Sequence, residues 1–171
     1  MLSEPEIYLR MKGWLREKKW KILGGEPPGG TNDIPIIEIK TSHYHGKGSY
    51  GSKKIDLVGY KEGYFIFLEL KTKYSRYDIE KLNTITSESV WRRAFIRALN
   101  EKLVLERANI ILPYETSSYV SSSNFFIKGV GFNYTGKLGE KDYVTFIPSG
   151  STMKPIIGPA VKREARELVE G

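Results

Sequence analysis

Residues 53–71 read KKIDLVGYKEGYFIFLELK, and this stretch decides the fold that we expect for the chain. Two arms rich in β-branched and aromatic residues, 54–60 and 64–71, flank the dipeptide Glu62-Gly63. This pattern is typical of a β-hairpin with a two-residue turn. The second arm, YFIFLEL, is apolar on both faces, as expected for a central strand that is covered on each side.

Outward from the hairpin, helical and strand patterns alternate along the chain. Ser3 is a suitable cap for a helix over residues 3–19, in which Ile7, Met11, Trp14 and Leu15 form one apolar stripe. Residues 24–30 are expected to form a loop. Further strands are expected at 34–40, 109–112, 124–132 and 142–147, and further helices at 87–107 and 159–170. The order predicts a single α/β domain over residues 1–171, with a central mixed β-sheet flanked by helices.

The composition of the 171 residues fits an ordinary globular protein, with 40% apolar and 27% charged residues. No apolar run approaches the roughly 20 residues that span a bilayer, and the first residues, MLSEPEIYLR, lack the pattern of a secretion signal. We therefore expect a cytoplasmic location and no membrane association. The absence of cysteine excludes disulfides and thiolate metal sites. The net charge of +7 favours a polyanionic partner such as nucleic acid, although a solvated lysine-rich surface has the same composition.

The hairpin register brings three charged residues onto one face. If the turn is Glu62-Gly63, the numbers of paired residues sum to 125, and Asp56 faces Glu69 with Cβ atoms about 5 Å apart. Lys71, two residues beyond Glu69, points to the same face. An otherwise apolar hairpin is thus expected to hold two carboxylates and one ammonium group close together.

Adjacent carboxylates repel each other, and a divalent metal such as Mg²⁺ or Mn²⁺ compensates them through oxygen ligands. Such an ion can polarise a phosphodiester and activate a water molecule, and Lys71 can orient that water or neutralise developing charge. The alternative is a simple ion pair at the end of a strand. Glu38-Ile39-Lys40 is a second Glu-x-Lys in this chain, but it has no acidic residue in hairpin register.

The stretch KKIDLVGYKEGYFIFLELK resembles the metal-binding hairpin of the PD-(D/E)XK, or restriction-endonuclease-like, nuclease superfamily, with a core similar to archaeal Holliday-junction resolvases. The resemblance implies that Asp56 and Glu69 are metal ligands, that Leu70 offers a backbone carbonyl, and that Lys71 is the catalytic lysine. It covers residues 3 to about 113, which leaves 118–171 as a β-rich extension with a short helix. Ile55 stands where the family motif has proline.

The family also places an acidic residue on the helix before these strands. Glu4 is in phase with the apolar stripe, whereas Glu6 has an alternative role as the acidic member of a Ser3-x-x-Glu6 capping box. Many members carry glutamine or lysine on the following helix. This chain has no glutamine, and Lys81, Arg92 and Arg93 remain alternatives at that place.

Two segments are candidates for nucleic-acid contact. Residues 43–54 lead into Asp56 and combine glycines, which allow close backbone approach, with basic and hydroxyl side chains; the candidates there are Lys47, Ser49, Ser52, Lys53 and Lys54. An ordinary flexible loop is the alternative, and His43 and His45 could bind a transition metal instead. In the helix 87–107, Arg92 and Arg93 suit phosphate contacts, or a solvated helix face.

The expected function is that of a Mg²⁺- or Mn²⁺-dependent DNA endonuclease, in which Asp56, Glu69, Lys71 and Glu4 form the catalytic site. A homodimer is expected because cutting both strands of a duplex usually needs two sites, and the apolar strands after residue 124 are candidates for its interface. The alternatives are a nucleic-acid-binding module that retains the fold without cleaving, and a structural protein whose charge cluster is an ion-pair network.

Overall fold

The hairpin expected within residues 53–71 lies at the middle of the sheet. In the computed structural model, which describes residues 1–28, 34–41 and 51–171, β4 (Leu57–Lys61) pairs antiparallel with β5 (Tyr64–Leu70). Lys61 lies opposite Tyr64 and Leu57 opposite Leu68, so the predicted register is confirmed over the whole ladder. Glu62 and Gly63 have φ angles of 48° and 89°, the positive values that a two-residue type I′ turn requires.

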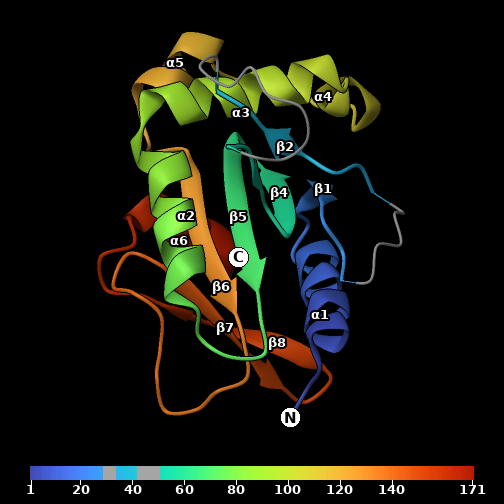
Figure 1. The fold of residues 1–171 in the computed structure, drawn as a ribbon, viewed down its shortest axis with the longest axis vertical. Helices are drawn as coiled ribbons and strands as arrows, with labels where there is room; N and C mark the ends of the chain where they lie inside the picture. The colour runs from blue at the N-terminus through green and yellow to red at the C-terminus, as the bar shows by residue number, and fades with distance from the viewer. Residues whose placement is uncertain (29–33, 42–50) are drawn as a thin grey trace.

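The central sheet has six strands and mixed direction, in the order β1-β4-β5-β6-β7-β8 (Figure 1). The pairs β5–β6 and β6–β7 are parallel, and the other neighbouring pairs are antiparallel. The remaining strands of this sheet are β1 (Lys21–Gly25), β6 (Phe126–Gly131), β7 (Val144–Ser149) and β8 (Thr152–Ile157). A separate pair joins β2 (Glu38–Ile39) to β3 (Lys53–Lys54). The α/β prediction is therefore confirmed, with helices packed against a mixed sheet.

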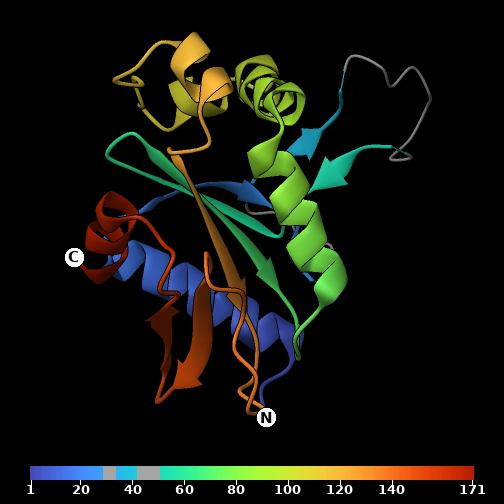
Figure 2. The same cartoon turned by 90° about the vertical axis from the view of Figure 1, so that its left-hand side faces the viewer.

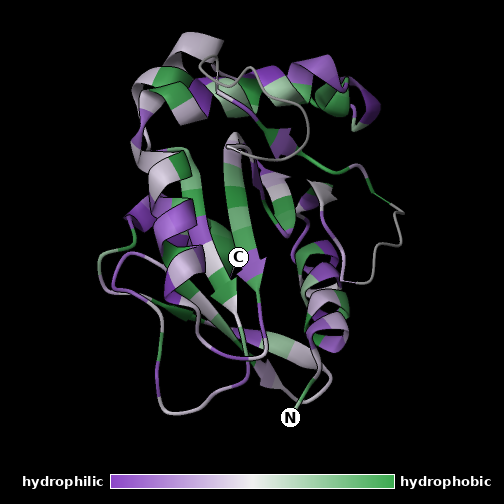
Figure 3. Cartoon of the chain, in the orientation of Figure 1, coloured by the Kyte–Doolittle hydropathy of each residue, from purple (hydrophilic) through white to green (hydrophobic). Residues whose placement is uncertain are grey.

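Helices cover both faces of this sheet (Figure 2). They are α1 (Glu4–Glu17), α2 (Arg76–Ser87), α3 (Ser89–Glu101), α4 (Val104–Arg107), α5 (Thr116–Ser121) and α6 (Arg163–Glu170). The core beside α2, α3 and α5 contains Phe65 and Phe67 of β5, and the core beside α1 and α6 contains Ile66 and Leu68. Because alternate residues of a strand point to opposite faces, β5 supplies both cores. Figure 3 shows its hydrophobic length interrupted by a hydrophilic band near the carboxyl end.

The face of the sheet that α2 covers is the one toward which Asp56 and Glu69 are directed. Val58, Tyr60, Phe65 and Phe67 belong to the core beside α2. By strand alternation, Asp56 points to the same face as Val58 and Tyr60, and Glu69 points to the same face as Phe65 and Phe67. The ladder itself stops at Leu57. Asp56 therefore lies one residue before β4, where its carbonyl accepts a hydrogen bond of 3.0 Å from the Glu26 amide.

Several expected boundaries were wrong, and glycine explains the first. We expected residues 24–30 to form a loop, yet Gly24 and Gly25 belong to β1. A Cβ atom at Gly25 would lie 2.2 Å from the Asp56 carbonyl oxygen, and one at Gly24 would lie 2.4 Å from that of Pro35. Glycine at these two positions allows the neighbouring backbone to approach closely. In the sequence, a glycine needed for this reason looks the same as a glycine in a loop.

Helix α2 was not expected, because Arg76–Ser87 is rich in residues of low helix propensity. Packing of Ile79, Leu82 and Ile85 against the sheet stabilises it instead. The helix expected at 87–107 is interrupted at Leu103, whose φ of 55° is left-handed. The strand expected at 109–112 is wrong, since Ile111 is 94% exposed and no strand partner occurs there among the described residues.

The strands expected at 124–132 and 142–147 correspond to β6 and β7, and β8 completes an antiparallel pair with β7. Val144 and Phe146 of β7 are buried inside this chain, as is Ile127 of β6. These three apolar side chains therefore contribute to the core of this chain, and the homodimer stays a prediction. Within the described ranges, no helix is both long and apolar enough to cross a membrane.

Arg92 is a structural residue, which corrects its assignment as a phosphate contact. It is 5% exposed, and its guanidinium donates hydrogen bonds of 2.7–3.0 Å to the carbonyls of Val120 and Thr86. This group ties α3 to α5 and to the end of α2. Its neighbour Arg93 is exposed on the same helix.

We expect Arg92→Ala to lower the free energy of unfolding by about 2–4 kcal/mol, because buried carbonyls lose a charged donor. Arg93→Ala is the matched control and should change stability by less than about 0.5 kcal/mol. Urea denaturation of both variants measures the difference. Equal effects of the two substitutions would contradict the structural role of Arg92.

Candidate active site

A cleft of about 520 Å³ is lined by residues just beyond the carboxyl end of β5, at the start of α1 and in the first turns of α2. It is lined by charged residues from five segments of the chain. They are Glu4, Glu26, Asp56, Lys71, Asp78 and Lys81. Glu69 lies beneath them and is 2% exposed. The structure thus brings together Asp56, Glu69, Lys71 and Glu4, all of which the sequence proposed for the site.

Glu69 is a buried carboxylate with little compensation. Lys81 Nζ lies 2.5 Å from its Oε1, but neither carboxylate oxygen has a hydrogen bond of good geometry in the described part of the chain. Burial and then the negative charge of Asp56 raise the pKa of Glu69 well above its usual value of 4.5, although Lys81 opposes this. The position therefore attracts a further positive charge.

Asp56 is held beside Glu69 by the backbone of the opposite strand. Its Oδ2 accepts a hydrogen bond of 2.8 Å from the Leu70 amide. This contact orients the carboxylate across the end of β5. The hairpin therefore fixes Asp56 and Glu69 relative to each other.

Lys71 remains a cation at the mouth of the cleft. Its side chain is 41% exposed, and Nζ lies 3.8 Å from Glu4 Oε1. Burial favours a lower pKa, but the negative charges of Asp56, Asp78 and Glu4 together outweigh it, so the pKa of Lys71 is raised. A lysine in this environment is suited to binding negative charge and not to accepting a proton.

The two acidic candidates on α1 have different roles. Glu6 accepts a hydrogen bond of 2.7 Å from the Ser3 amide and completes the capping box. This backbone hydrogen bond lowers the pKa of Glu6, which is exposed. Glu4 faces Lys71 and lines the cleft. Of the two, Glu4 is placed to take part in the site.

Asp78 is a member of the site that the sequence did not reveal. It is 3% exposed, and its Oδ2 has no hydrogen-bond partner among the described residues. Burial raises its pKa, while the charges of Lys71 and Lys81 act in the opposite direction. The available signal was the pattern Ser75-x-x-Asp78, in which Ser75 caps α2. Because we did not expect α2, the start of that helix was not identified.

Of the three basic candidates for the following helix, Lys81 is the one that lies at the cleft. It lies on α2, contacts Glu69 and donates a hydrogen bond of 2.9 Å to the Lys54 carbonyl. Arg92 and Arg93 belong to α3 and do not line the cleft. Lys81 therefore joins the carboxylate of β5 to the segment that leads into Asp56.

The remaining nucleic-acid candidates have partners within the chain, or lie outside the described residues. Ser52 donates a hydrogen bond of 2.8 Å to Glu38, Lys53 lies 5.0 Å from the centre of the Trp91 ring, and Lys54 lies 3.9 Å from Glu26. Lys47, Ser49, His43 and His45 fall outside the described residues. The contacts of Lys53 and Lys54 leave the ammonium groups near the surface, beside the segment before Asp56.

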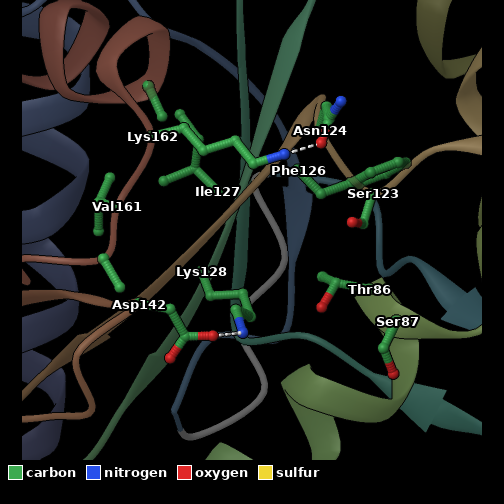
Figure 4. Close-up of a pocket in the computed structure, with 12 residues that line it drawn as sticks. Thr86, Ser87, Ser123, Asn124, Phe126, Ile127, Lys128, Asp142, Val161 and Lys162 are labelled. Carbon is green, nitrogen blue, oxygen red and sulfur yellow. Dashed lines mark hydrogen bonds and ion pairs between the residues drawn. The ribbon is translucent and has the colours of Figure 1, made fainter.

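A second cavity of about 290 Å³ lies beside β6, the end of α2 and the segment before α6. Figure 4 shows its two lysines engaged with neighbouring side chains, Lys128 with Asp142 and Lys162 with Asn124. Lys128 also donates a hydrogen bond of 2.9 Å to Asn83. Since these ammonium groups are already satisfied, this cavity is a weaker candidate for chemistry than the cleft.

The donor set of the cleft suits a hard divalent cation. No group of three or more His, Asp or Glu side chains within residues 1–28, 34–41 and 51–171 forms a ready metal cage. Mg²⁺ does not need one, because it commonly binds through one or two carboxylates and keeps several waters. The buried carboxyl group of Glu69, next to Asp56 and paired only through Oε1 with Lys81 among the described residues, fits such an ion.

Comparison of the chain with protein families, with curated proteins and with solved structures found no match.

We expect Glu69→Gln to raise the free energy of unfolding at neutral pH in the presence of EDTA. Because the folded-state pKa of Glu69 is raised, the stability contributed by this group is complete below about pH 4.5 and is lost as pH rises through the folded-state pKa. Urea denaturation of both proteins between about pH 4 and pH 8 tests this. The advantage of the variant should grow with pH, and a constant difference would contradict the explanation.

Proposed function

We propose that this protein is a metal-dependent DNA endonuclease of the restriction-endonuclease-like kind. The observation that carries the proposal is the buried carboxylate of Glu69, held beside Asp56 at a strand end with Lys71 and Lys81 around it. Buried, incompletely compensated charges reduce stability and are typical of functional sites. The net charge of +7 suits a polyanionic substrate.

The arrangement of elements supports the finer fold assignment. A helix precedes an antiparallel hairpin, a helix follows it, and the next strand, β6, returns parallel to β5. The resemblance implies a helix with an acidic residue before the hairpin, and a lysine or glutamine on the following helix. Glu4, which pairs with Lys71, and Lys81, which pairs with Glu69, are our candidates for these two positions.

Asp56 and Glu69 would hold Mg²⁺ or Mn²⁺, together with the Leu70 carbonyl that the resemblance implies. When bound, such an ion polarises the phosphodiester and lowers the pKa of water. Lys71, which stays protonated, donates hydrogen bonds to the phosphate oxygens on which negative charge develops, or orients the attacking water. Glu4 positions Lys71 through their ion pair. Lys81 keeps the Glu69 carboxylate oriented and offsets part of its burial.

The second candidate function is a DNA-binding module that does not cleave. The basic charge favours it as much as it favours an enzyme. It gives no reason, however, for Asp56, Glu69 and Asp78 to gather at the cleft, because acidic groups repel phosphate.

If the enzyme cuts both strands of a duplex, a homodimer would supply the two sites.

We expect wild-type protein to cleave DNA with Mg²⁺ or Mn²⁺ and not with EDTA, and Glu69→Gln and Lys71→Ala to lower the rate at least about 100-fold. The second Glu-x-Lys provides matched controls, because Glu38 and Lys40 form an ion pair of 3.6 Å away from the cleft. Glu38→Gln and Lys40→Ala should retain cleavage. Labelled duplex, single-stranded, flap and four-way-junction DNAs measure the rate. Binding without cleavage of any of them, with any metal, would support the binding module instead.

Metal should also stabilise the folded protein. At an Mg²⁺ concentration 100 times the dissociation constant, the free energy of unfolding is expected to rise by about 2.7 kcal/mol through mass action. Asp56→Asn should abolish this increase, whereas Glu38→Gln should leave it intact. Thermal or urea unfolding at matched ionic strength measures the change. The same rise in wild type and Asp56→Asn would show that the ion binds elsewhere.

A further inference from the structure

Tyr77 is an exposed aromatic residue placed at the cleft. It is the second residue of α2, directly before Asp78, and it is 72% exposed. It lines the same cleft as Asp56 and Lys71. Exposure of this ring contributes no burial free energy to the fold. Its position at the cleft indicates a contact with substrate.

The cleft also has apolar lining from a different part of the chain. Pro27 and Pro28 follow β1, and Ile36 precedes β2. The cleft therefore combines charged groups at the end of β5 with aromatic and aliphatic surface from α2 and from the segments around β1 and β2. A phosphate and a base need these two kinds of surface side by side.

We propose that the cleft accepts an unpaired nucleotide, with its base against Tyr77 and its phosphate near Lys71, so that the preferred substrate contains single-stranded DNA at or beside the cut. The inference rests on the proposed nuclease function and names the substrate class of that site. A base within a duplex is stacked and paired, and its faces are not available to a side chain. An unpaired base offers a face to Tyr77 whatever its identity, so the preference is structural and not sequence-specific.

Charge beside Tyr77 supports a strand that follows this path. Lys71 and the exposed Lys73 lie in the segment between β5 and α2. Exposed Arg76 adjoins Tyr77, with its Nε 3.1 Å from Glu80. A backbone leaving the cleft along this segment meets basic side chains on its way, as single-strand binding surfaces require.

Binding in EDTA separates this inference from cleavage. The probes are a short single strand that carries 2-aminopurine, whose fluorescence falls when it stacks, and a duplex of the same length. The proteins are wild type, Tyr77→Ala, Tyr77→Phe and, as the matched control, Tyr134→Ala. Tyr134 is 59% exposed and is not part of the cleft lining.

We expect Tyr77→Ala to weaken single-strand binding about 5- to 150-fold and to abolish the fluorescence change, with little effect on duplex binding. Tyr77→Phe and Tyr134→Ala should behave as wild type, because the first keeps the ring and the second lies elsewhere. Equal losses on single strand and duplex, or no loss from Tyr77→Ala, would overturn the inference. A loss in Tyr77→Phe equal to that in Tyr77→Ala would also overturn it, because the hydroxyl would then carry the contact.

The two proposals fail in different experiments. If Mg²⁺-dependent cleavage occurs and Tyr77→Ala retains single-strand affinity, only the stacking inference is wrong. If no substrate is cleaved but the ring-dependent binding is present, the endonuclease proposal fails and the cleft still binds unpaired nucleotides. Unchanged melting temperatures of the Tyr77 variants confirm that the comparison is between folded proteins.

Discussion

The constraint on which the site depends is the burial of the Glu69 carboxyl group, whose pKa is raised well above its usual value. The residue belongs to a strand that is otherwise apolar on both faces and lies between two hydrophobic cores. Its carboxylate is compensated only in part, by Lys81 of α2. Three features affect how this carboxyl group is accommodated. They are the position of α2 over the end of β5, the placement of Asp56 and the shape of the cleft. Replacing a buried ion pair by well-packed apolar residues is often neutral or stabilising, so stability alone does not require this pair.

The two lysines near Glu69 differ in how far they are exposed to solvent. Lys81 is largely buried and contacts Glu69, whereas Lys71 is half-exposed and faces Glu4 at the mouth. Asp78 lies near both lysines and has an unpartnered oxygen. The deep lysine thus neutralises buried charge, whereas the outer lysine pairs with Glu4 and stays accessible to solvent. The two lysines have the same side-chain chemistry, so their different contacts follow from how deeply each is buried.

The part of the site carried by the hairpin was predictable because its register follows from local rules. Two positive φ angles at Glu62 and Gly63 fix the turn, and strand alternation then places Asp56, Glu69 and Lys71 on one face. The part carried by α2 was not predictable, since tertiary packing and not helix propensity stabilises that helix. Asp78 was missed for this reason, and Lys81 was one of three alternatives. Arg92 was misassigned because a basic residue at helical spacing looks the same in sequence whether it contacts solvent or buried carbonyls.

The parallel pairing of β5 with β6 has a consequence for any attempt to shorten the protein. The six pairs from Phe65–Phe126 to Leu70–Gly131, together with the hydrogen bond of 3.0 Å from the Lys71 amide to the Gly131 carbonyl, give β5 its second neighbour. A fragment that ends near residue 113 would keep every residue of the motif but turn β5 into a bare edge, apolar on both faces. Such edges recruit strands from other molecules. The minimal soluble unit therefore includes β6 and the elements that cover it, although the residues proposed for catalysis all lie before residue 82.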